Sequence, residues 1–250
     1  MSNILNSSLN NIRIVLIQTS HPGNIGSAAR AMKTMGLSEL YLVKPKKYPD
    51  EQAVAMSSNA TDILDNAIVV ESLEDALVNC HLVLGTSARH ERTLRWDILE
   101  PRESGERLVT EAKKGKVAVI FGRESSGLSN DELALCHFLV HIPTNSEYSS
   151  LNLASAVQIL SYECRIADIA NATNESDKDE DEGVVTADMM EGFYKHLEKA
   201  MIDSEFLDPE NPRHLMTRLR RLYGRLRVTP SELNILRGML SAFQKNYKKK

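Results

Sequence analysis

Three segments of small and polar residues are the first candidates for binding chemistry in this sequence. They span residues 86–88, 121–128 and 142–152, and each follows a short apolar run. Ligands of open α/β sheets bind outside the carboxyl ends of the strands, where loops present backbone donors and acceptors. Gly122 and Gly127 would let the backbone approach a ligand closely. One such loop alone is better explained as a strand-to-helix turn, but together they predict a pocket that accepts an adenine and a ribose.

Several other chemistries lack their sequence patterns. The sequence has no G-x-x-x-x-G-K-[ST] motif, which disfavours a P-loop nucleoside triphosphatase. It has no G-x-G-x-x-G after the first apolar run, which disfavours dinucleotide binding and the usual Rossmann-type methyltransferase. No Ser-His-Asp set and no zinc-ligand cluster is evident from spacing, so no metal is expected. The scattered histidines fit structural or exposed positions better than catalytic ones: His21, His81, His90, His137 and His141.

The elements that must position these loops follow from the apolar pattern of residues 12 to about 142. The predicted strands cover residues 12–17, 40–43, 68–70, 82–84, 117–121 and 138–142. The predicted helices between them lie near residues 24–35, 73–79, 103–114 and 131–136. Continuous apolar strands separated by helices are typical of a parallel sheet that is covered on both faces.

Residues 150–170 predict one long helix with two apolar stripes, each repeating every three to four residues. The first comprises Leu153, Val157, Leu160, Cys164 and Ala167, and the second comprises Ile159, Tyr162, Ile166 and Ile169. One stripe suffices to dock the helix on its own sheet, so the second favours contact with another copy of the chain. The alternative is a helix enclosed within one larger core.

The chain changes character after residue 170. Residues 171–183 are polar and acidic and predict a flexible linker, whereas residues 184–250 predict helices only. Residues 212–227 predict a basic helix with one apolar stripe, formed by Leu215, Leu219, Leu222 and Leu226. Its other faces carry six arginines and no carboxylate: Arg213, Arg218, Arg220, Arg221, Arg225 and Arg227. A membrane surface, an acidic partner or plain solvation also suits such a helix, but the missing carboxylate favours phosphate binding.

The composition is compatible with a nucleic-acid partner. The 250 residues suffice for one domain and a smaller appendage. The net charge is −4, but residues 175–182 carry six acidic side chains against one lysine, so the rest of the chain is close to neutral. Cys80, Cys136 and Cys164 are far apart and predict reduced thiols in a cytoplasmic protein. No signal peptide and no apolar run long enough to span a membrane is apparent.

The polar segments resemble the three signature motifs of the SPOUT methyltransferase family. They read HPGNIGSAAR at 21–30, FGRESSGL at 121–128 and IPTNSEYSSLNLASAV at 142–157, and the match extends over roughly residues 10 to 170. The resemblance implies a parallel α/β sheet with a C-terminal trefoil knot, followed here by a small all-helical domain. With TSAR at 86–89 and NILRG at 234–238, the chain is most similar to bacterial tRNA methyltransferases that act on the first anticodon-loop nucleotide.

The resemblance divides the chain into a methyltransferase domain (1–170), an acidic linker (171–183) and a helical tRNA-binding extension (184–250). It implies that the motif loops bind S-adenosyl-L-methionine, and that Glu124 and Asn152 also support those loops. The implied cofactor residues are Thr86, Ser87, Ala88, Gly122, Glu124, Ile142, Ser149, Ser150, Leu151 and Asn152.

The implied reaction is methyl transfer to the ribose 2′-hydroxyl of cytidine or uridine at tRNA position 32. Arg30 and Ser150 would be catalytic, Arg30 by stabilising charge on the ribose oxygen and Ser150 by orienting the hydroxyl. The implied contacts to the tRNA anticodon stem-loop are Asn24, Arg89, Arg92, Arg218, Arg221 and Arg225, with Arg89 and Arg92 as alternatives for one contact. A homodimer is expected, and neither DNA nor a membrane is an expected partner.

Two other functions remain open at this point. The same fold could methylate another RNA, at an rRNA ribose or at a base nitrogen, because RNA shape and the appended domain choose the acceptor. A non-catalytic RNA-binding protein could also keep a methyltransferase-like fold. The complete set of Asn24, Arg30, Glu124 and Asn152 argues against that second reading.

Overall fold

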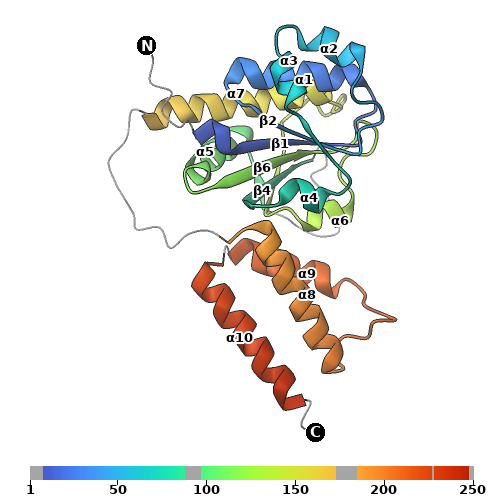
Figure 1. Ribbon diagram of the computed structural model, residues 1–250, viewed down its shortest axis with the longest axis vertical. Helices are drawn as coiled ribbons and strands as arrows, with labels where there is room; N and C mark the ends of the chain where they lie inside the picture. The colour runs from blue at the N-terminus through green and yellow to red at the C-terminus, as the bar shows by residue number, and fades with distance from the viewer. Residues whose placement is uncertain (1–7, 88–96, 173–184, 227, 248–250) are drawn as a thin grey trace.

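A parallel sheet forms the centre of the larger, N-terminal unit. The computed structural model describes residues 8–87, 97–172, 185–226 and 228–247. Seven strands follow the order β3-β2-β1-β6-β4-β7-β5, and all neighbouring pairs are parallel (Figure 1). The strands are β1 (Ile12–Ile17), β2 (Glu39–Val43), β3 (Ile68–Val70), β4 (Cys80–Thr86), β5 (Ile98–Leu99), β6 (Lys116–Phe121) and β7 (Phe138–Val140). The predicted parallel α/β fold is confirmed.

Helices cover both faces of the sheet, as the continuous apolar strands predict. One face carries α1 (Pro22–Met35), α5 (Pro101–Ala112) and α7 (Leu153–Ala172), and the other carries α4 (Leu73–Leu77) and α6 (Asn130–Ala134). Strand side chains alternate between the two cores: Ile12, Ile14 and Leu16 of β1 join the first, and Val15 and Ile17 join the second. The sheet therefore holds its polar loops at its ends rather than on its faces.

The sequence did not predict four of the short elements. β5 has two residues, and α2 (Glu51–Ser57) and α3 (Thr61–Asp65) have seven and five, too few for a clear apolar period. The turn η1 (Ser8–Asn11) before β1 was also not predicted. A Cβ at Gly26 would collide with the carbonyl oxygen of Ala53, so this glycine is what lets α2 lie directly against α1.

Two predicted boundaries beside the polar loops differ from the structure in ways that matter for the site. The strand predicted at 138–142 ends at Val140, so Ile142 belongs to a loop. The helix predicted from residue 150 begins at Leu153, because the Asn152 side chain caps it: its Oδ1 accepts hydrogen bonds from Ala154 N at 2.9 Å and Ser155 N at 3.3 Å. The other predicted strand and helix boundaries of the N-terminal unit agree within two residues.

The two apolar stripes of α7 differ in burial. The first stripe is buried in the core of the N-terminal unit, as predicted. The second stripe lies outward, and Tyr162, Ile166 and Ile169 expose 46%, 36% and 50% of their surface. Among the described residues nothing covers this face, so a helix enclosed within one core is excluded for a single chain.

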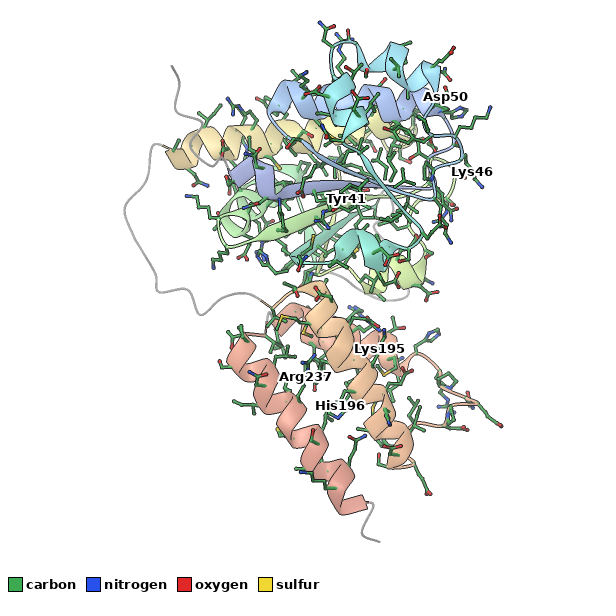
Figure 2. All side chains as sticks on the ribbon, in the orientation of Figure 1. Tyr41, Lys46, Asp50, Lys195, His196 and Arg237 are labelled. Carbon is green, nitrogen blue, oxygen red and sulfur yellow. The ribbon has the colours of Figure 1, made fainter. Side chains whose placement is uncertain are left out.

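The C-terminal unit consists of helices over its described residues, 185–226 and 228–247. They are α8 (Ala187–Asp203), α9 (Leu215–Leu226) and α10 (Pro230–Tyr247), and their core includes Phe193, Leu197 and Leu233. Figure 2 shows His196 of α8 and Arg237 of α10 between the two helices. The His196 ring contacts Gln244 Oε1 at 2.9 Å, and Arg237 donates to Met189 O at 2.8 Å. The predicted linker at 171–183 lies outside the described residues, apart from the last two residues of α7.

The apolar face of α9 differs from the predicted stripe. Leu215 and Leu219 pack on the helical core, but Leu222 and Leu226 are 44% and 63% exposed. Tyr223 packs in their place, because its ring meets Phe193 edge-on with centroids 5.0 Å apart. This rotation also brings Arg220 to Glu191, whose carboxylate it binds with both terminal nitrogens at 2.6 and 3.0 Å. One of the six arginines therefore has a carboxylate partner on α8.

No helix among the described residues is both long enough and apolar enough to cross a membrane.

Candidate active site

A cavity of about 300 Å³ opens where three adjacent strands end. Thr86, Phe121 and Val140 are the last residues of β4, β6 and β7, which lie side by side in the sheet. The loops after these strands supply most of the lining: Thr86, Ser87, Phe121, Gly122, Arg123, Glu124, Ser125, Ser126, Gly127, Leu128, Val140, Ile142, Thr144, Ser149, Ser150, Leu151, Leu153 and Ala156. The predicted meeting of the three polar segments is therefore found in the structure.

The structure places most of the predicted cofactor residues in this lining. They are Thr86, Ser87, Gly122, Glu124, Ile142, Ser149, Ser150 and Leu151. Ala88, Arg89 and Arg92 lie outside the described residues. The lining also contains Arg123, Ser125, Ser126 and Thr144, which were not predicted as cofactor residues from the sequence. Each lies within the second or third motif, so its place in the motif could have identified it.

The Glu124 carboxylate ties the second motif to the first. It accepts hydrogen bonds from Ser20 N at 3.1 and 3.2 Å, from Ser20 Oγ at 3.1 Å and from His21 N at 3.4 Å. It also accepts one from Asn24 Nδ2 at 3.1 Å. Partial burial alone raises the pKa of Glu124, but these hydrogen bonds outweigh it and hold the pKa below its ordinary value. The residue is therefore an ionised anchor for the loop that begins α1.

Asn24 and Asn152 extend the same network to the third motif. Asn152 Nδ2 donates to Asn24 Oδ1 at 3.0 Å, while Asn152 Oδ1 caps α7. Each amide therefore uses both its oxygen and its nitrogen within the network. Asn152 itself is not part of the cavity lining, and its observed hydrogen bonds match the supporting role that the resemblance implies. Asn24 is half-buried, and both ends of its amide take part in the same network.

A second network fixes the loop that contains the two glycines. Arg123 binds Glu132 with two hydrogen bonds at 3.0 and 2.9 Å, and its Nε donates to Gln18 Oε1 at 2.9 Å. Glu132 also accepts from Ser129 N at 2.7 Å, completing a capping box at the start of α6. Burial by itself raises the pKa of Glu132, but the Arg123 guanidinium and Ser129 hold it below its usual range. Arg123 thus braces the cavity wall against both β1 and α6.

Close backbone approach requires Gly122, and a left-handed backbone conformation favours Gly127. A Cβ at Gly122 would collide with the backbone of Gly127, so the chain folds back on itself only with glycine there. Gly127 has φ of +69°, in the left-handed region. Arg123 N donates to Gly127 O at 3.2 Å, and Gly127 N donates to Arg123 O at 2.9 Å. The loop is a fixed backbone surface at the cavity.

The predicted catalytic pair is not brought together within one chain. Ser150 is exposed in the cavity wall. Arg30 is exposed on α1 and does not line the cavity. It follows Asn24 by six residues, which places it about 9 Å further along the helix axis and on another side of the helix. The described residues of a single chain therefore supply the cavity and Ser150, but Arg30 is not part of its lining.

Three of the predicted RNA-binding arginines, Arg218, Arg221 and Arg225, lie in the C-terminal unit and are not part of the cavity lining. Arg218 and Arg225 are exposed on α9, and Arg221 is half-buried. Partial burial and the neighbouring Arg225 lower the pKa of Arg221, while Asp97 opposes that shift. Among the described residues, no group of histidine, cysteine and acidic side chains has the arrangement of a metal site.

Glu124→Gln is expected to lower Tm at pH 7 by roughly 5 °C, because an amide oxygen cannot replace a carboxylate that accepts from Ser20, His21 and Asn24. The folded pKa of Glu124 is depressed, so its stabilisation is present above the unfolded pKa and is lost as pH falls through the folded pKa. The Tm difference between wild type and variant should therefore shrink on acidification from pH 7 toward pH 3. Glu147→Gln, in the exposed part of the third motif, is the control for loss of charge. A Tm difference that stays constant with pH would contradict the assignment.

Comparison with known proteins adds a family for each unit. Residues 11–162 match the SpoU rRNA Methylase family, and residues 188–250 match the family described as tRNA methyltransferase TrmJ, C-terminal domain. A tRNA (cytidine/uridine-2′-O-)-methyltransferase TrmJ from Photorhabdus laumondii is 53% identical over 96% of this chain and 100% of its own. The tRNA (cytidine/uridine/adenosine-2′-O-)-methyltransferase TrmJ from Pseudomonas aeruginosa is 54% identical over 95% of each chain.

Solved structures agree with these matches. TrmJ from Z. mobilis superposes with a TM-score of 0.81 at 29% identity, over 93% of this chain and 98% of its own. A probable methylase family protein from Haemophilus influenzae superposes with a TM-score of 0.64 at 48% identity, over 96% and 98%. The resemblance of the three motifs is thereby confirmed along nearly the whole chain. This chain belongs to the SpoU methylase family and, within it, to the TrmJ group.

Proposed function

We propose that this protein is an S-adenosyl-L-methionine-dependent methyltransferase that modifies the ribose 2′-hydroxyl of cytidine or uridine in tRNA. The observation that carries the proposal is the network of Glu124, Asn24 and Asn152, which joins all three motifs around one cavity. The TrmJ relatives, which are 53–54% identical over nearly the full length, support the acceptor and the two bases. A non-catalytic RNA-binding protein would need neither the cavity nor the network.

The cavity fits the cofactor in size and in chemistry. Its volume of about 300 Å³ lies in the range of small-molecule sites. Thr86, Ser87 and Ser126 offer polar contacts, while Leu128 and Leu153 provide apolar walls for an adenine ring. Gly122 lets the loop fold back against Gly127, and the backbone of both glycines lines the cavity. When bound, S-adenosyl-L-methionine supplies a sulfonium methyl group as the electrophile.

The chain's own residues align and activate the ribose oxygen. Holding that oxygen in line with the methyl group removes several kcal/mol from the barrier, roughly up to 7–11 kcal/mol in ideal cases. Ser150, exposed at the cavity, orients the hydroxyl. Arg30 stabilises the negative charge that develops on the oxygen and holds the adjacent phosphate. A guanidinium stays protonated at physiological pH, so Arg30 acts electrostatically and the proton leaves through the phosphate or water.

A homodimer brings Arg30 to the cavity of the partner subunit. This part of the proposal is supported by the absence of Arg30 from the lining of its own cavity and by the uncovered stripe of α7. An exposed row of Tyr162, Ile166 and Ile169 on a long helix is the pattern of a surface that is buried in an assembly. Each active site would then combine the loops of one protomer with a cation from the other.

Ile166→Asp is expected to convert the dimer to monomers, because it would place an unpaired charge in the middle of the apolar stripe. Sedimentation velocity at micromolar concentration measures the change. Val69→Asp is the matched control, since Val69 is also an exposed aliphatic residue but lies on β3 at the sheet edge. A monomeric wild type, or an Ile166→Asp variant that remains a dimer, would contradict this assembly.

The helical unit recognises the anticodon stem-loop and sets the target at position 32. Arg218, Arg221 and Arg225 repeat along one face of α9 at a spacing suited to successive phosphates. Arg89 or Arg92, outside the described residues, adds a contact beside the active site. We assign residues 1–170 to methyl transfer, 171–183 to a linker and 184–250 to RNA binding. The protein is expected to act in the cytoplasm.

The trefoil knot is part of the same proposal. β7 is hydrogen-bonded between β4 and β5, two strands that precede it in the chain. A late segment threaded between earlier strands is what a knotted sheet requires. The loops after β6 and β7 would then be held by threading as well as by the Glu124 network.

The direct test is mass spectrometry of tRNA nucleosides from a strain that lacks the gene. Loss of 2′-O-methylcytidine and 2′-O-methyluridine at position 32, with restoration by the gene on a plasmid, is the expected result. Calorimetric titration with S-adenosyl-L-methionine tests the cofactor separately. A protein that binds RNA but not this cofactor would be the non-catalytic alternative, and loss of an rRNA or base methylation instead would reassign the acceptor.

A further inference from the structure

The loop between α8 and α9 displays an aromatic ring that the proposed function does not use. Phe206 exposes 71% of its surface, the largest fraction among the five phenylalanines of the chain. Its neighbour Leu207 is only 4% exposed and belongs to the helical core. Met201 O accepts hydrogen bonds from both Phe206 N at 3.0 Å and Leu207 N at 3.1 Å. The anchored leucine and this double hydrogen bond fix the turn in a form that directs Phe206 outward.

Phe206 stands between two surface hollows. On one side a hollow of about 760 Å³ is lined by Phe206 together with Pro212, Arg213, His214 and Arg218. On the other side a second hollow is lined by Phe206 with Phe243 and Gln244 of α10, among other residues. An aromatic ring that forms part of the wall of two hollows is accessible from both. In Figure 1 this loop projects from the side of the helical unit, beyond the end of α8.

Cations gather on one side of the ring. Arg213 and Arg218 are exposed, and neither forms an ion pair with any residue that the structure describes. By contrast Arg220, two residues after Arg218, is held by Glu191. Asp208 also lines this hollow, but its Oδ1 already accepts a hydrogen bond from Glu210 N at 2.9 Å. On the side of Arg213 and Arg218 the available charge is therefore mainly positive, whereas the second hollow contains the carboxylates of Asp203 and Glu205.

The cations continue from Phe206 along α9. His214, Arg218, Arg221 and Arg225 follow one another at spacings of four, three and four residues, which places them on one helix face. Arg218 N donates to His214 O at 3.0 Å, so the helical spacing already holds at His214. A row of cations that ends at an open aromatic ring is the arrangement with which proteins hold unpaired nucleotides, with charge on the backbone and a ring against the base.

We propose that Phe206 is a stacking platform for one unpaired base of the RNA substrate, with Arg213 and Arg218 binding the flanking phosphates. The assignment rests on the proposed tRNA function and adds a contact outside the arginine face of α9. A second protein chain fits this place less well, because charged and polar side chains form most of the wall beside the ring. A base brings a flat apolar face and a phosphate together, which matches both parts of the surface.

The experiment compares tRNA affinity among Phe206 variants of the full chain across a range of salt concentrations. Phe206→Ala should weaken binding about tenfold, within the range for loss of one stacked base. Phe206→Trp should restore it, whereas Phe206→Leu, which keeps apolar bulk without a ring, should not. The salt dependence of Phe206→Ala should match wild type because no charge is lost, while Arg218→Ala should give a shallower slope. Ile235→Ala, at a residue on α10 that is 62% exposed, is the matched control and should bind as wild type does.

Phe206→Trp offers a direct signal as well, because the chain contains only one other tryptophan. Its added fluorescence should be quenched when tRNA binds. Wild-type affinity in Phe206→Ala, or full rescue by leucine, would overturn the stacking assignment. A changed sedimentation coefficient in Phe206→Ala would assign the ring to a protein interface instead. If wild type itself neither binds nor methylates tRNA, the proposed function fails; if it does both while Phe206→Ala is unchanged, only this inference fails.

Discussion

Arg30→Ala is expected to lower kcat by orders of magnitude while leaving the affinity for S-adenosyl-L-methionine nearly unchanged. Cofactor affinity should be unchanged because Arg30 does not line the cavity of its own chain. Turnover should fall because the proposed role of Arg30 is to stabilise the transition state. Removing one preorganised donor at a developing oxyanion costs about 10²–10³ in kcat in well-studied enzymes. Single-turnover methyl transfer measures the chemical step, and calorimetry measures cofactor binding.

Two further variants sharpen this expectation. Arg30→Lys should also be slow, because an ammonium group cannot reproduce the planar two-pronged contact of a guanidinium with oxyanion and phosphate. Lys33→Ala removes a cation from the same helix, one that binds Asp62 at 2.7 Å, and should retain activity. Near-normal turnover in Arg30→Lys would show that positive charge alone is enough. Weakened cofactor binding in Arg30→Ala would place the residue in the cavity instead.

Mixing experiments test whether Arg30 acts across the dimer. An Arg30→Ala protomer keeps intact loops, and a Ser150→Ala protomer keeps its arginine. A heterodimer of the two would contain one site with both changes and one site with neither. Mixing two poorly active proteins should therefore restore activity in proportion to the heterodimers formed. No recovery after verified subunit exchange would assign Arg30 to its own chain.

The core of the N-terminal unit could be predicted because its central strands β1, β4 and β6 are buried on both faces. Residues 12–17 and 68–70 were predicted with their observed bounds, although Arg13 interrupts the first apolar run and Ile68 and Val69 are exposed on the edge strand β3. α2, α3 and β5 are held by contacts with larger elements, such as Ala53 against Gly26, rather than by a period of their own. Short elements of this kind leave too little pattern in a single sequence.

In the helical unit, the sequence predicted the helix α9 but not which of its faces is buried. The leucine spacing of α9 suggests a buried stripe that includes Leu222 and Leu226, yet Tyr223 is the residue that packs. Both faces include Leu215 and Leu219, but Tyr223 lies about 100° around the helix from Leu222, so the two faces diverge in the second half of α9. Only the position of Phe193 on α8 decides between them. Which face of α9 is buried therefore depends on tertiary packing. The same orientation of α9 brings Arg220 to Glu191.

The cavity residues could be found from motifs, but their partners could not. Eight of the ten residues named for the cofactor line one cavity, because strand ends of a parallel sheet share an edge. That Glu124 binds the backbone before α1, more than a hundred residues earlier in the chain, follows only from the fold. The same holds for Arg123, whose partners Gln18 and Glu132 lie on opposite sides of it in sequence.

A tRNA with a single 2′-deoxy nucleotide at position 32 is expected to bind normally and to accept no methyl group. Binding should persist because phosphate contacts dominate the affinity of such interfaces, and one hydroxyl adds little. Transfer should stop because the deoxy sugar lacks the oxygen that Ser150 and Arg30 are proposed to hold. Transfer of a radioactive methyl group and a filter-binding assay on the same tRNA separate the two effects.

The matched control is a tRNA with the 2′-deoxy change at a neighbouring loop nucleotide, which should be methylated at close to the rate of the all-ribose tRNA. Cytidine and uridine at the target should both be accepted, because they present the same ribose and a loop nucleotide can be turned outward to expose it. Specificity would then come from the shape of the stem-loop, held by Arg218, Arg221 and Arg225. Methylation of the deoxy target would place the acceptor on the base, and the cavity would have to be read as a site that holds a nucleobase edge rather than a ribose.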